Sequence, residues 1–197
     1  MSRLILASQS PRRRELLMQL GANFSVASAD IDESVLVGEQ AEAYVSRLAQ
    51  AKARVIAQRH PATWVLGSDT TVVVEGEILG KPQDEEDAVR MLMRLSGRCH
   101  TTLTAVALLR IEGEVEQCLS QRVATQVRFR PLNEALCRRY WATGEPADKA
   151  GAYGIQGLGG ALVESIEGSF SAVVGLPLCE TAQLLEQAGL ATWLADA

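Results

Sequence analysis

Three arginines stand where a helix is predicted to begin, although cations are unfavourable at that end of a helix. The segment reads Ser8-Gln9-Ser10-Pro11-Arg12-Arg13-Arg14, in which Ser10 suits a helix N-cap and Pro11 the first helical position. The positive end of the helix dipole disfavours each cation by roughly 0.3–1 kcal/mol. Hydroxyls, backbone N–H groups and guanidinium groups at one helix start can, however, bind a phosphate. The alternative is that these arginines are solvated and point away.

A lysine stands on the apolar face of the long helix predicted over residues 41–60. Apolar residues from Tyr44 to Ile56 recur at helical spacing, and Lys52 falls on the same stripe. Because burial of an unpaired ammonium is costly, Lys52 must either extend to solvent or meet a negative partner.

Asp69 comes after the apolar run Trp64-Val65-Leu66. In open α/β sheets, ligands collect at the carboxyl ends of strands, where a carboxylate can hold a metal or a water. A turn or helix-cap aspartate is the alternative. Asp30-Ile31-Asp32-Glu33 supplies more carboxylates, although acidic clusters are usually just solvated, and Gly80-Lys81-Pro82 supplies a further cation in a rigid turn.

Glycine is unusually dense between residues 151 and 160, at Gly151, Gly154, Gly157, Gly159 and Gly160. Glycine lets a backbone come close to a ligand, and the amide of Gln156 within this stretch could bind the edge of a nucleobase. A long structural turn is the alternative, because clustered glycines alone are weak evidence of a site.

Length, hydrophobic content and net charge limit the classes of protein to which this chain can belong. The chain has 197 residues, 47% of them hydrophobic, and 19 basic against 24 acidic residues give a net charge of −5. We therefore expect one ordered domain over residues 1–197 that coats neither nucleic acid nor a membrane surface. The four cysteines form no close pair, which is typical of reduced thiols and not of a zinc site. With no signal or membrane-spanning run, we expect a cytoplasmic protein.

Segments with strand and helix periodicity alternate along the chain, which predicts an α/β fold with a mixed, twisted sheet and flanking helices. Helices are predicted over Pro11–Gly21, residues 41–60, Asp84–Ser96, residues 134–144 after an Asn133 cap, and Leu178–Gly189. Strands are predicted over Arg3–Ala7, in two runs of residues 63–79 separated by a break at Gly67-Ser68-Asp69, and in two hairpins that turn at Glu112-Gly113-Glu114 and Glu167-Gly168.

Taken in order, several of these segments resemble the Maf family of nucleoside triphosphate pyrophosphatases. They are LILASQSPRRRELL, DIDE, RLAQAKA, GSDT, ILGKP, LSGRCHTTLTAVAL, and KAGAYGIQGLGG followed by VVGLPL. The resemblance covers essentially the whole chain. It implies an elongated two-lobed molecule similar to the inosine triphosphate pyrophosphatases, with the active-site cleft between its lobes. It also implies a homodimer and the hydrolysis of a nucleoside triphosphate to monophosphate and pyrophosphate with a divalent cation, Mg²⁺ or Mn²⁺.

The same resemblance implies a role for individual residues. Asp69 matches the family's proton acceptor, and Glu33, Lys52 and Lys81 match its other catalytic positions. Glu33 and Asp69 would hold the metal. The family's phosphate-binding motif is matched by Ser8, Ser10 and Arg13.

Three further positions indicate a subtype. Arg12, Thr70 and Gln156 resemble the branch that cleaves dTTP and UTP, whereas the branch preferring 7-methyl-GTP differs there. Ser68 departs from the usual pattern, in which alanine is common before the aspartate. A nucleotide-binding regulator of cell division is the alternative function, because the family also carries the label of septum-formation inhibitor. Paired carboxylates beside cations favour the enzyme, since a pure binding protein has no need of them.

Overall fold

The computed structural model describes residues 4–194, so Arg3, the first residue of the first predicted strand, lies outside the described part. The chain divides into two compact units. Unit 1 comprises the described residues 4–69, 104–123 and 175–194, and unit 2 comprises residues 70–103 and 124–174. Three long strands pass from one unit into the other: β3 (Trp64–Val74), β5 (Cys99–Glu112) and β6 (Val115–Phe129).

The strands form one mixed sheet, as the sequence predicts. The shorter strands are β1 (Leu4–Ala7), β2 (Ser25–Ala27), β4 (Glu77–Leu79) and β7 (Val163–Glu167). The order of the sheet is β2-β1-β3-β5-β6-β7, and β4 also pairs with β3. Strand β1 pairs in parallel with β2 and β3, whereas β3 with β4 and β6 with β7 are antiparallel. The edge strand β2 was not predicted, since three residues carry too little periodicity.

Helices lie close to the predicted ranges. They are α1 (Pro11–Gln19), α2 (Ala41–Ala57), α3 (Glu85–Leu95), α4 (Glu134–Trp141), α5 (Phe170–Val174) and α6 (Leu178–Gln187), with short 3-10 turns at η1 (Glu145–Asp148), η2 (Ala150–Ala152) and η3 (Leu158–Leu162). Side-chain caps from Ser10, Asp84 and Asn133 begin α1, α3 and α4. Over the described residues, no helix has the length and apolar character to span a bilayer.

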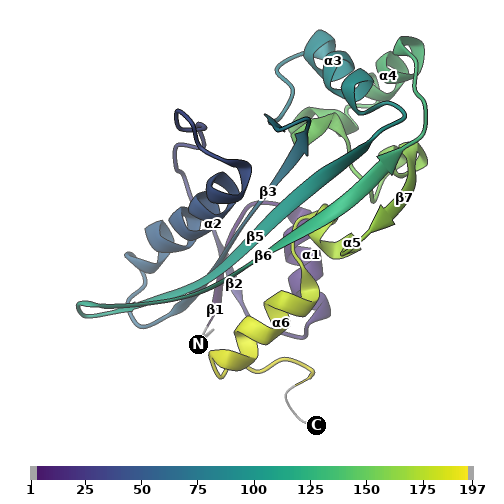
Figure 1. Ribbon diagram of the computed structural model, residues 1–197. Coiled ribbons are helices and arrows are strands. Elements are labelled where there is room, and N and C mark those ends of the chain that lie inside the picture. Colours follow the sequence, from purple (N-terminus) through teal and green to yellow (C-terminus); the bar gives the residue numbers. More distant parts are fainter. Residues whose placement is uncertain (1–3, 195–197) are drawn as a thin grey trace. The chain divides into compact units, whose positions relative to one another are not determined.

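In unit 1, helices cover both faces of the sheet. All four residues of β1 are buried. Ile5 and Ala7 pack with Ala53 and Ile56 of α2. Because side chains alternate along a strand, Leu4 and Leu6 face the opposite side. Figure 1 shows α1 and α6 there, across the strands from α2.

Strand β3 runs unbroken through residues 64–74, so the predicted break at Gly67-Ser68-Asp69 is wrong. A Cβ at Gly67 would lie 2.2 Å from the Ala49 carbonyl oxygen and 2.8 Å from the Ala53 nitrogen of α2. Glycine is therefore required because the backbone of α2 packs directly on this strand, and not because the chain turns. This close packing brings Lys52 of α2 beside Asp69.

The second predicted hairpin is also wrong, because residues 170–174 form helix α5 instead of a strand. Strand β7 pairs with β6. The Ser169 hydroxyl accepts from the backbone N–H of Ala172 at 3.2 Å, and the Ser169 N–H donates to Thr125 Oγ1 at 3.0 Å. Such a serine cap favours a helical turn, whereas a short apolar run alone fits either structure.

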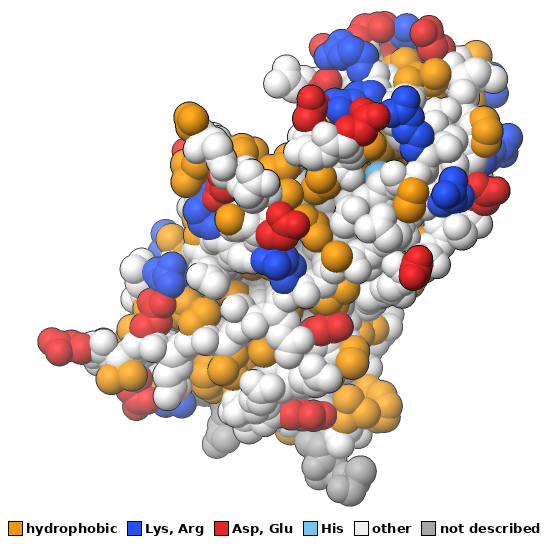
Figure 2. All heavy atoms as spheres, in the orientation of Figure 1, with side chains coloured by type: hydrophobic (Ala, Val, Ile, Leu, Met, Phe, Trp, Pro, Cys, Tyr) orange, Lys and Arg blue, Asp and Glu red, His pale blue; other side chains and the backbone are white. Residues whose placement is uncertain are grey.

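Unit 2 has its own core, in which α3 and α4 lie side by side (Figure 1). Phe129, His100 and Tyr153 form edge-to-face ring contacts with centroids 4.7–5.5 Å apart. His100 is buried with Nε2 2.9 Å from the Tyr153 hydroxyl, and burial lowers the pKa of the imidazole to about 4. Over α3 and α4 the surface mixes acidic and basic side chains (Figure 2), paired for example as Arg138–Glu86 at 2.6 Å.

Candidate functional site

The start of helix α1 has the geometry of an anion site. The Ser10 hydroxyl accepts from the Arg13 N–H at 3.5 Å, and the Ser8 hydroxyl accepts from the Ser10 N–H at 3.1 Å. Ser8 is buried, while Arg12 and Arg13 are half-buried in the first helical turn. Two serine hydroxyls and two arginines thus belong to the start of one helix, where the helix dipole also favours negative charge.

Arg13 is held in place by a backbone carbonyl from a distant part of unit 1. Its Nε donates to the Gly175 oxygen at 2.8 Å. The same oxygen lies 2.9 Å from the hydroxyl of Ser68, which is also 3.0 Å from the Ala105 oxygen. Ser68, the departure from the usual alanine, therefore helps to fix the carbonyl that orients Arg13.

The centre of the site is one ammonium in contact with two carboxylates. Lys52 Nζ lies 2.7 Å from Asp69 Oδ1 and 2.6 Å from Glu33 Oε1. Lys52 and Asp69 are buried, whereas 45% of the Glu33 side chain is exposed. Of the two alternatives for Lys52, extension to solvent is excluded. Three residues that the sequence places far apart are brought into one cluster.

Burial and the neighbouring charges shift the pKa values of the buried groups in this cluster in opposite directions. Burial raises the pKa of the Asp69 carboxyl, although Lys52 and Arg13 act to lower it. Burial likewise lowers the pKa of the Arg13 guanidinium, against the opposite influence of Asp69 and Glu33. A buried carboxylate whose pKa is raised is better able to accept a proton than an ordinary aspartate.

Sequence reasoning missed the side chains that hold the Glu33 segment. The Tyr44 hydroxyl donates to the Glu33 carbonyl oxygen at 3.0 Å, and Arg47 forms a two-point ion pair with Glu39 at 2.6 and 2.7 Å. Arg47 also donates to the Ser34 oxygen at 2.9 Å. Burial and the charges of Asp69 and Glu33 raise the pKa of Tyr44 to about 12. Tyr44 could have been noticed, since its hydroxyl needs a hydrogen-bond partner, but it was counted only as an apolar residue of the predicted helix.

The other predicted residues belong to unit 2. Thr70 follows Asp69 in β3 and is half-buried, and Lys81 is exposed in the loop after β4. The Gly80 carbonyl accepts from the Gly151 N–H at 3.0 Å, so the Lys81 turn and the glycine-rich segment are neighbours. Gln156 is exposed in that segment.

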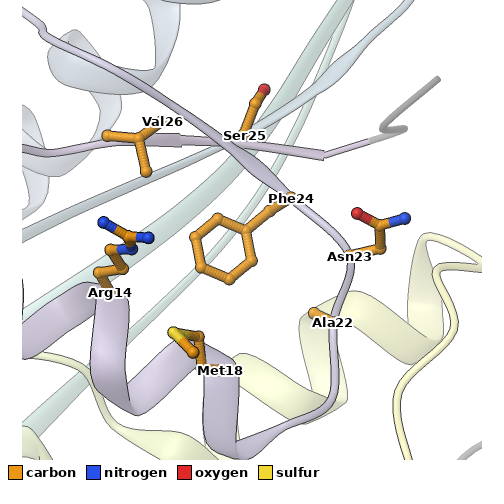
Figure 3. Close-up of a pocket in the computed structure, with 7 residues that line it drawn as sticks. All are labelled: Arg14, Met18, Ala22, Asn23, Phe24, Ser25 and Val26. Carbon is orange, nitrogen blue, oxygen red and sulfur yellow. The ribbon is translucent and has the colours of Figure 1, made fainter.

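A pocket of about 440 Å³ lies between α1 and β2 of unit 1, and none of the predicted site residues is among those that line it (Figure 3). Arg14 and Met18 extend from α1 toward the ring of Phe24. A neighbouring pocket of about 340 Å³ shares Arg14, Met18 and Val26 and is lined by Ser8 and Ser10 as well. Of these two pockets, the second is the one that touches the phosphate-binding motif.

Among residues 4–194, no group of three or more His, Cys, Asp and Glu side chains is arranged to hold a metal ion. Glu33 and Asp69 form a pair, linked through Lys52. Magnesium is commonly held by one or two carboxylates together with water and substrate phosphates. The pair therefore fits a divalent cation that shares its coordination with a bound nucleotide.

A family model and several curated relatives match this chain over most of its length. The family described as Maf-like protein matches residues 3–188. The chain belongs to the Maf family. A relative from Hahella chejuensis, named dTTP/UTP pyrophosphatase, is 56% identical over 194 residues, covering 97% of this chain and 94% of its own. A Myxococcus xanthus protein of the same name is 58% identical over 187 residues, covering 95% and 93%.

Other Maf relatives extend this pattern. A Colwellia psychrerythraea protein, again named dTTP/UTP pyrophosphatase, is 55% identical over 192 residues and covers 95% of this chain and 89% of its own. Among solved structures, the Staphylococcus aureus Ham1 protein shows a remote likeness, with a TM-score of 0.42, 14% identity, and coverage of 63% of this chain and 71% of that one.

Proposed function

We propose that this Maf protein is a nucleoside triphosphate pyrophosphatase that hydrolyses dTTP and UTP, and modified pyrimidine nucleotides, to the monophosphate and pyrophosphate. The observation that carries the proposal is the Lys52 ammonium in contact with Glu33 and Asp69. The names and 55–58% identity of its near full-length relatives support the choice of nucleotide.

In the proposed reaction, Asp69 accepts the proton of a water that attacks the α-phosphorus. The pyrophosphate leaves as the bond between the α-phosphorus and the bridging oxygen breaks, and its developing charge needs cations nearby. Lys52 and Lys81 would supply positive charge, and Ser8, Ser10 and Arg13 would bind phosphate oxygens at the start of α1. Glu33 holds Lys52 in its present position.

Glu33 and Asp69 would also hold the divalent cation, Mg²⁺ or Mn²⁺. When bound there, such an ion lowers the pKa of a coordinated water and neutralises phosphate charge. The support for this assignment is the exposed position of Glu33 beside the buried Asp69.

Base selection is assigned to Arg12, Thr70 and Gln156. The Gln156 amide offers both a donor and an acceptor, which suits the O4 and N3–H edge of uracil or thymine. Cytosine reverses that pattern. Sites built to hydrogen-bond a substrate group discriminate against analogues that leave the site's polar groups unpaired.

Location and assembly are also proposals. The described cysteines carry no disulfide, which supports a reducing cytoplasm. A homodimer is proposed from the family resemblance, and light scattering of the purified chain tests it by giving twice the 21.2 kDa protomer mass.

The experiment is pyrophosphate release from dTTP, UTP, CTP, ATP and GTP, each measured with Mg²⁺, with Mn²⁺ and after chelation. We expect kcat/KM for dTTP and UTP to exceed that for the others, and turnover to stop without metal. Absence of turnover with every nucleotide and metal would overturn the proposal that the protein is an enzyme, and it would favour a nucleotide-binding regulator. Equal use of all five would overturn only the pyrimidine preference.

A further inference from the structure

A carboxylate that the proposed reaction does not use lies at the centre of the glycine-rich segment. Glu145 begins η1, and its Oε1 accepts from the Tyr140 hydroxyl at 2.6 Å and from the Gly159 N–H at 2.9 Å. Its Oε2 accepts from the Leu158 N–H at 2.8 Å. The Tyr140 oxygen in turn accepts from the Gly154 N–H at 3.0 Å. Three backbone N–H groups of one loop thus converge on two side chains.

The glycines of this loop are required by close contact with those same side chains. A Cβ at Gly157 would lie 2.2 Å from Glu145 Oε2, and a Cβ at Gly159 would lie 2.3 Å from the Tyr140 oxygen. The glycines therefore allow the backbone of this loop to pack tightly around the Glu145 carboxylate. The most direct function of the glycine-rich loop in the described structure is to bind Glu145.

The hydrogen bonds favour the ionised form of the Glu145 carboxylate. Burial acts to raise the pKa of Glu145, but the hydrogen bonds from Tyr140, Gly159 and Leu158 outweigh it and hold the pKa below its ordinary value. Lys149 reinforces the turn, since its Nζ donates to the Glu145 carbonyl oxygen at 2.5 Å. Bonds to a charged acceptor are about twice as strong as neutral ones, so the bonds from residues 158 and 159 to the carboxylate hold that end of the loop most firmly.

Gln156 lies between the anchored positions. The anchors are Gly154 on one side and residues 158–159 on the other, and Gln156 itself is exposed. From this arrangement, we infer that Glu145, together with Tyr140, is a positioning residue that sets nucleotide selectivity by holding Gln156 in one orientation. The inference rests on the proposed function, in which Gln156 contacts the base.

The test compares kcat/KM for UTP and CTP in wild type, Glu145→Gln, Tyr140→Phe and Gln156→Ala. Loss of one hydrogen bond corresponds to roughly 3–10-fold. We expect each variant to lower the UTP/CTP ratio by about that factor, with an unchanged metal requirement. Glu164→Gln, an exposed glutamate of β7, is the matched control and should keep the wild-type ratio. A merely destabilised protein would lose activity on both nucleotides alike.

A double variant decides whether Glu145 acts through Gln156. If it does, Glu145→Gln combined with Gln156→Ala should be no less selective than Gln156→Ala alone. Hydrogen exchange of the amides of residues 154–159 provides a readout without turnover, and it should be faster in Glu145→Gln and Tyr140→Phe. Tyr140→Phe keeps the ring, so it also serves if Glu145→Gln does not fold.

The outcomes separate this inference from the proposed function. A wild type that releases no pyrophosphate overturns the function, and the same comparison made on Kd for UTP and CTP then decides the role of Glu145. Faster exchange with an unchanged UTP/CTP ratio would overturn the inference, as would additive losses in the double variant.

Discussion

Two carboxylates of this protein, Asp69 in unit 1 and Glu145 in unit 2, have opposite chemical environments. Asp69 is buried against a lysine, and burial raises its pKa. Glu145 accepts three hydrogen bonds from a tyrosine and two backbone N–H groups, which together lower its pKa. Where burial outweighs the nearby cations, as at Asp69, the carboxylate is better able to accept a proton, whereas hydrogen bonds that outweigh burial, as at Glu145, favour the anion. The first environment suits catalysis and the second suits structure.

The strongest test of this comparison removes each charge in turn. Asp69→Asn should keep the fold and reduce turnover by about 10²–10⁴-fold, because the amide cannot accept the proton. Glu145→Gln should leave kcat for UTP within a few-fold of wild type and change selectivity instead. Pyrophosphate release measures both effects, with Glu164→Gln, an exposed carboxylate of β7, as the control. Near-normal turnover by Asp69→Asn would show that the two carboxylates do not differ in this way.

The buried His100 of unit 2 and Asp69 of unit 1 should change the free energy of unfolding in opposite directions as the pH falls. The folded pKa of His100, about 4, is below the unfolded value near 6.5, so the unfolded chain binds more protons between those values. Stability should therefore fall as pH decreases through this window, by roughly 2 kcal/mol at pH 5. The raised pKa of Asp69 has the opposite sign, since its contribution is lost as pH rises.

Denaturant unfolding at pH 7.5 and pH 5 measures this effect. His100→Gln should show a shallower loss of stability at pH 5 than wild type, whatever its stability at pH 7.5. His60→Gln, which replaces an exposed histidine, should behave as wild type does. Parallel curves for all three proteins would contradict the assignment to His100.

A glycine in each unit lies against a close neighbour, so a Cβ added at Gly67 or at Gly157 tests how far that neighbour can move. Gly67→Ala places a Cβ against the backbone of α2, which cannot move away, and should cost about 1–3 kcal/mol of the free energy of unfolding. Gly157→Ala places a Cβ against the end of a glutamate side chain, which can move, so its thermodynamic cost should be smaller. Its main effect should be a lower UTP/CTP ratio. A larger stability loss for Gly157→Ala would show that the loop is more rigid than its contacts indicate.

The smallest expected effect concerns Ser68, a polar side chain fully buried in unit 1. Ser68→Ala removes the hydroxyl that contacts the Ala105 and Gly175 oxygens, at a cost of roughly 0.5–1.5 kcal/mol. Arg13 still donates to the Gly175 oxygen, so turnover should stay within a few-fold of wild type. Thermal unfolding and pyrophosphate release check both parts, and a large loss of turnover would place Ser68 closer to the chemistry.

Local sequence patterns were enough to predict the class of fold and most of the helices, and they singled out several residues of the candidate site. Helix caps such as Ser10 and Asn133 act within a few residues, so local sequence is enough to place them. Lysine on an apolar stripe left two outcomes open, extension to solvent or contact with a negative partner. Only the resemblance to the Maf family placed Lys52, Glu33 and Asp69 in one active site before the structure showed their contacts.

Contacts between residues far apart in sequence could be seen only in the folded chain. Gly67 read as a turn because its real constraint, the backbone of α2, lies far away in sequence. Residues 170–174 read as a strand because their helix depends on a serine held by Thr125 of another strand. Glu145 was not singled out in the sequence, because a lone glutamate acquires its role only when the Tyr140 hydroxyl and two backbone N–H groups donate to it in the folded chain. Local propensity fixes elements, whereas long-range packing fixes partners.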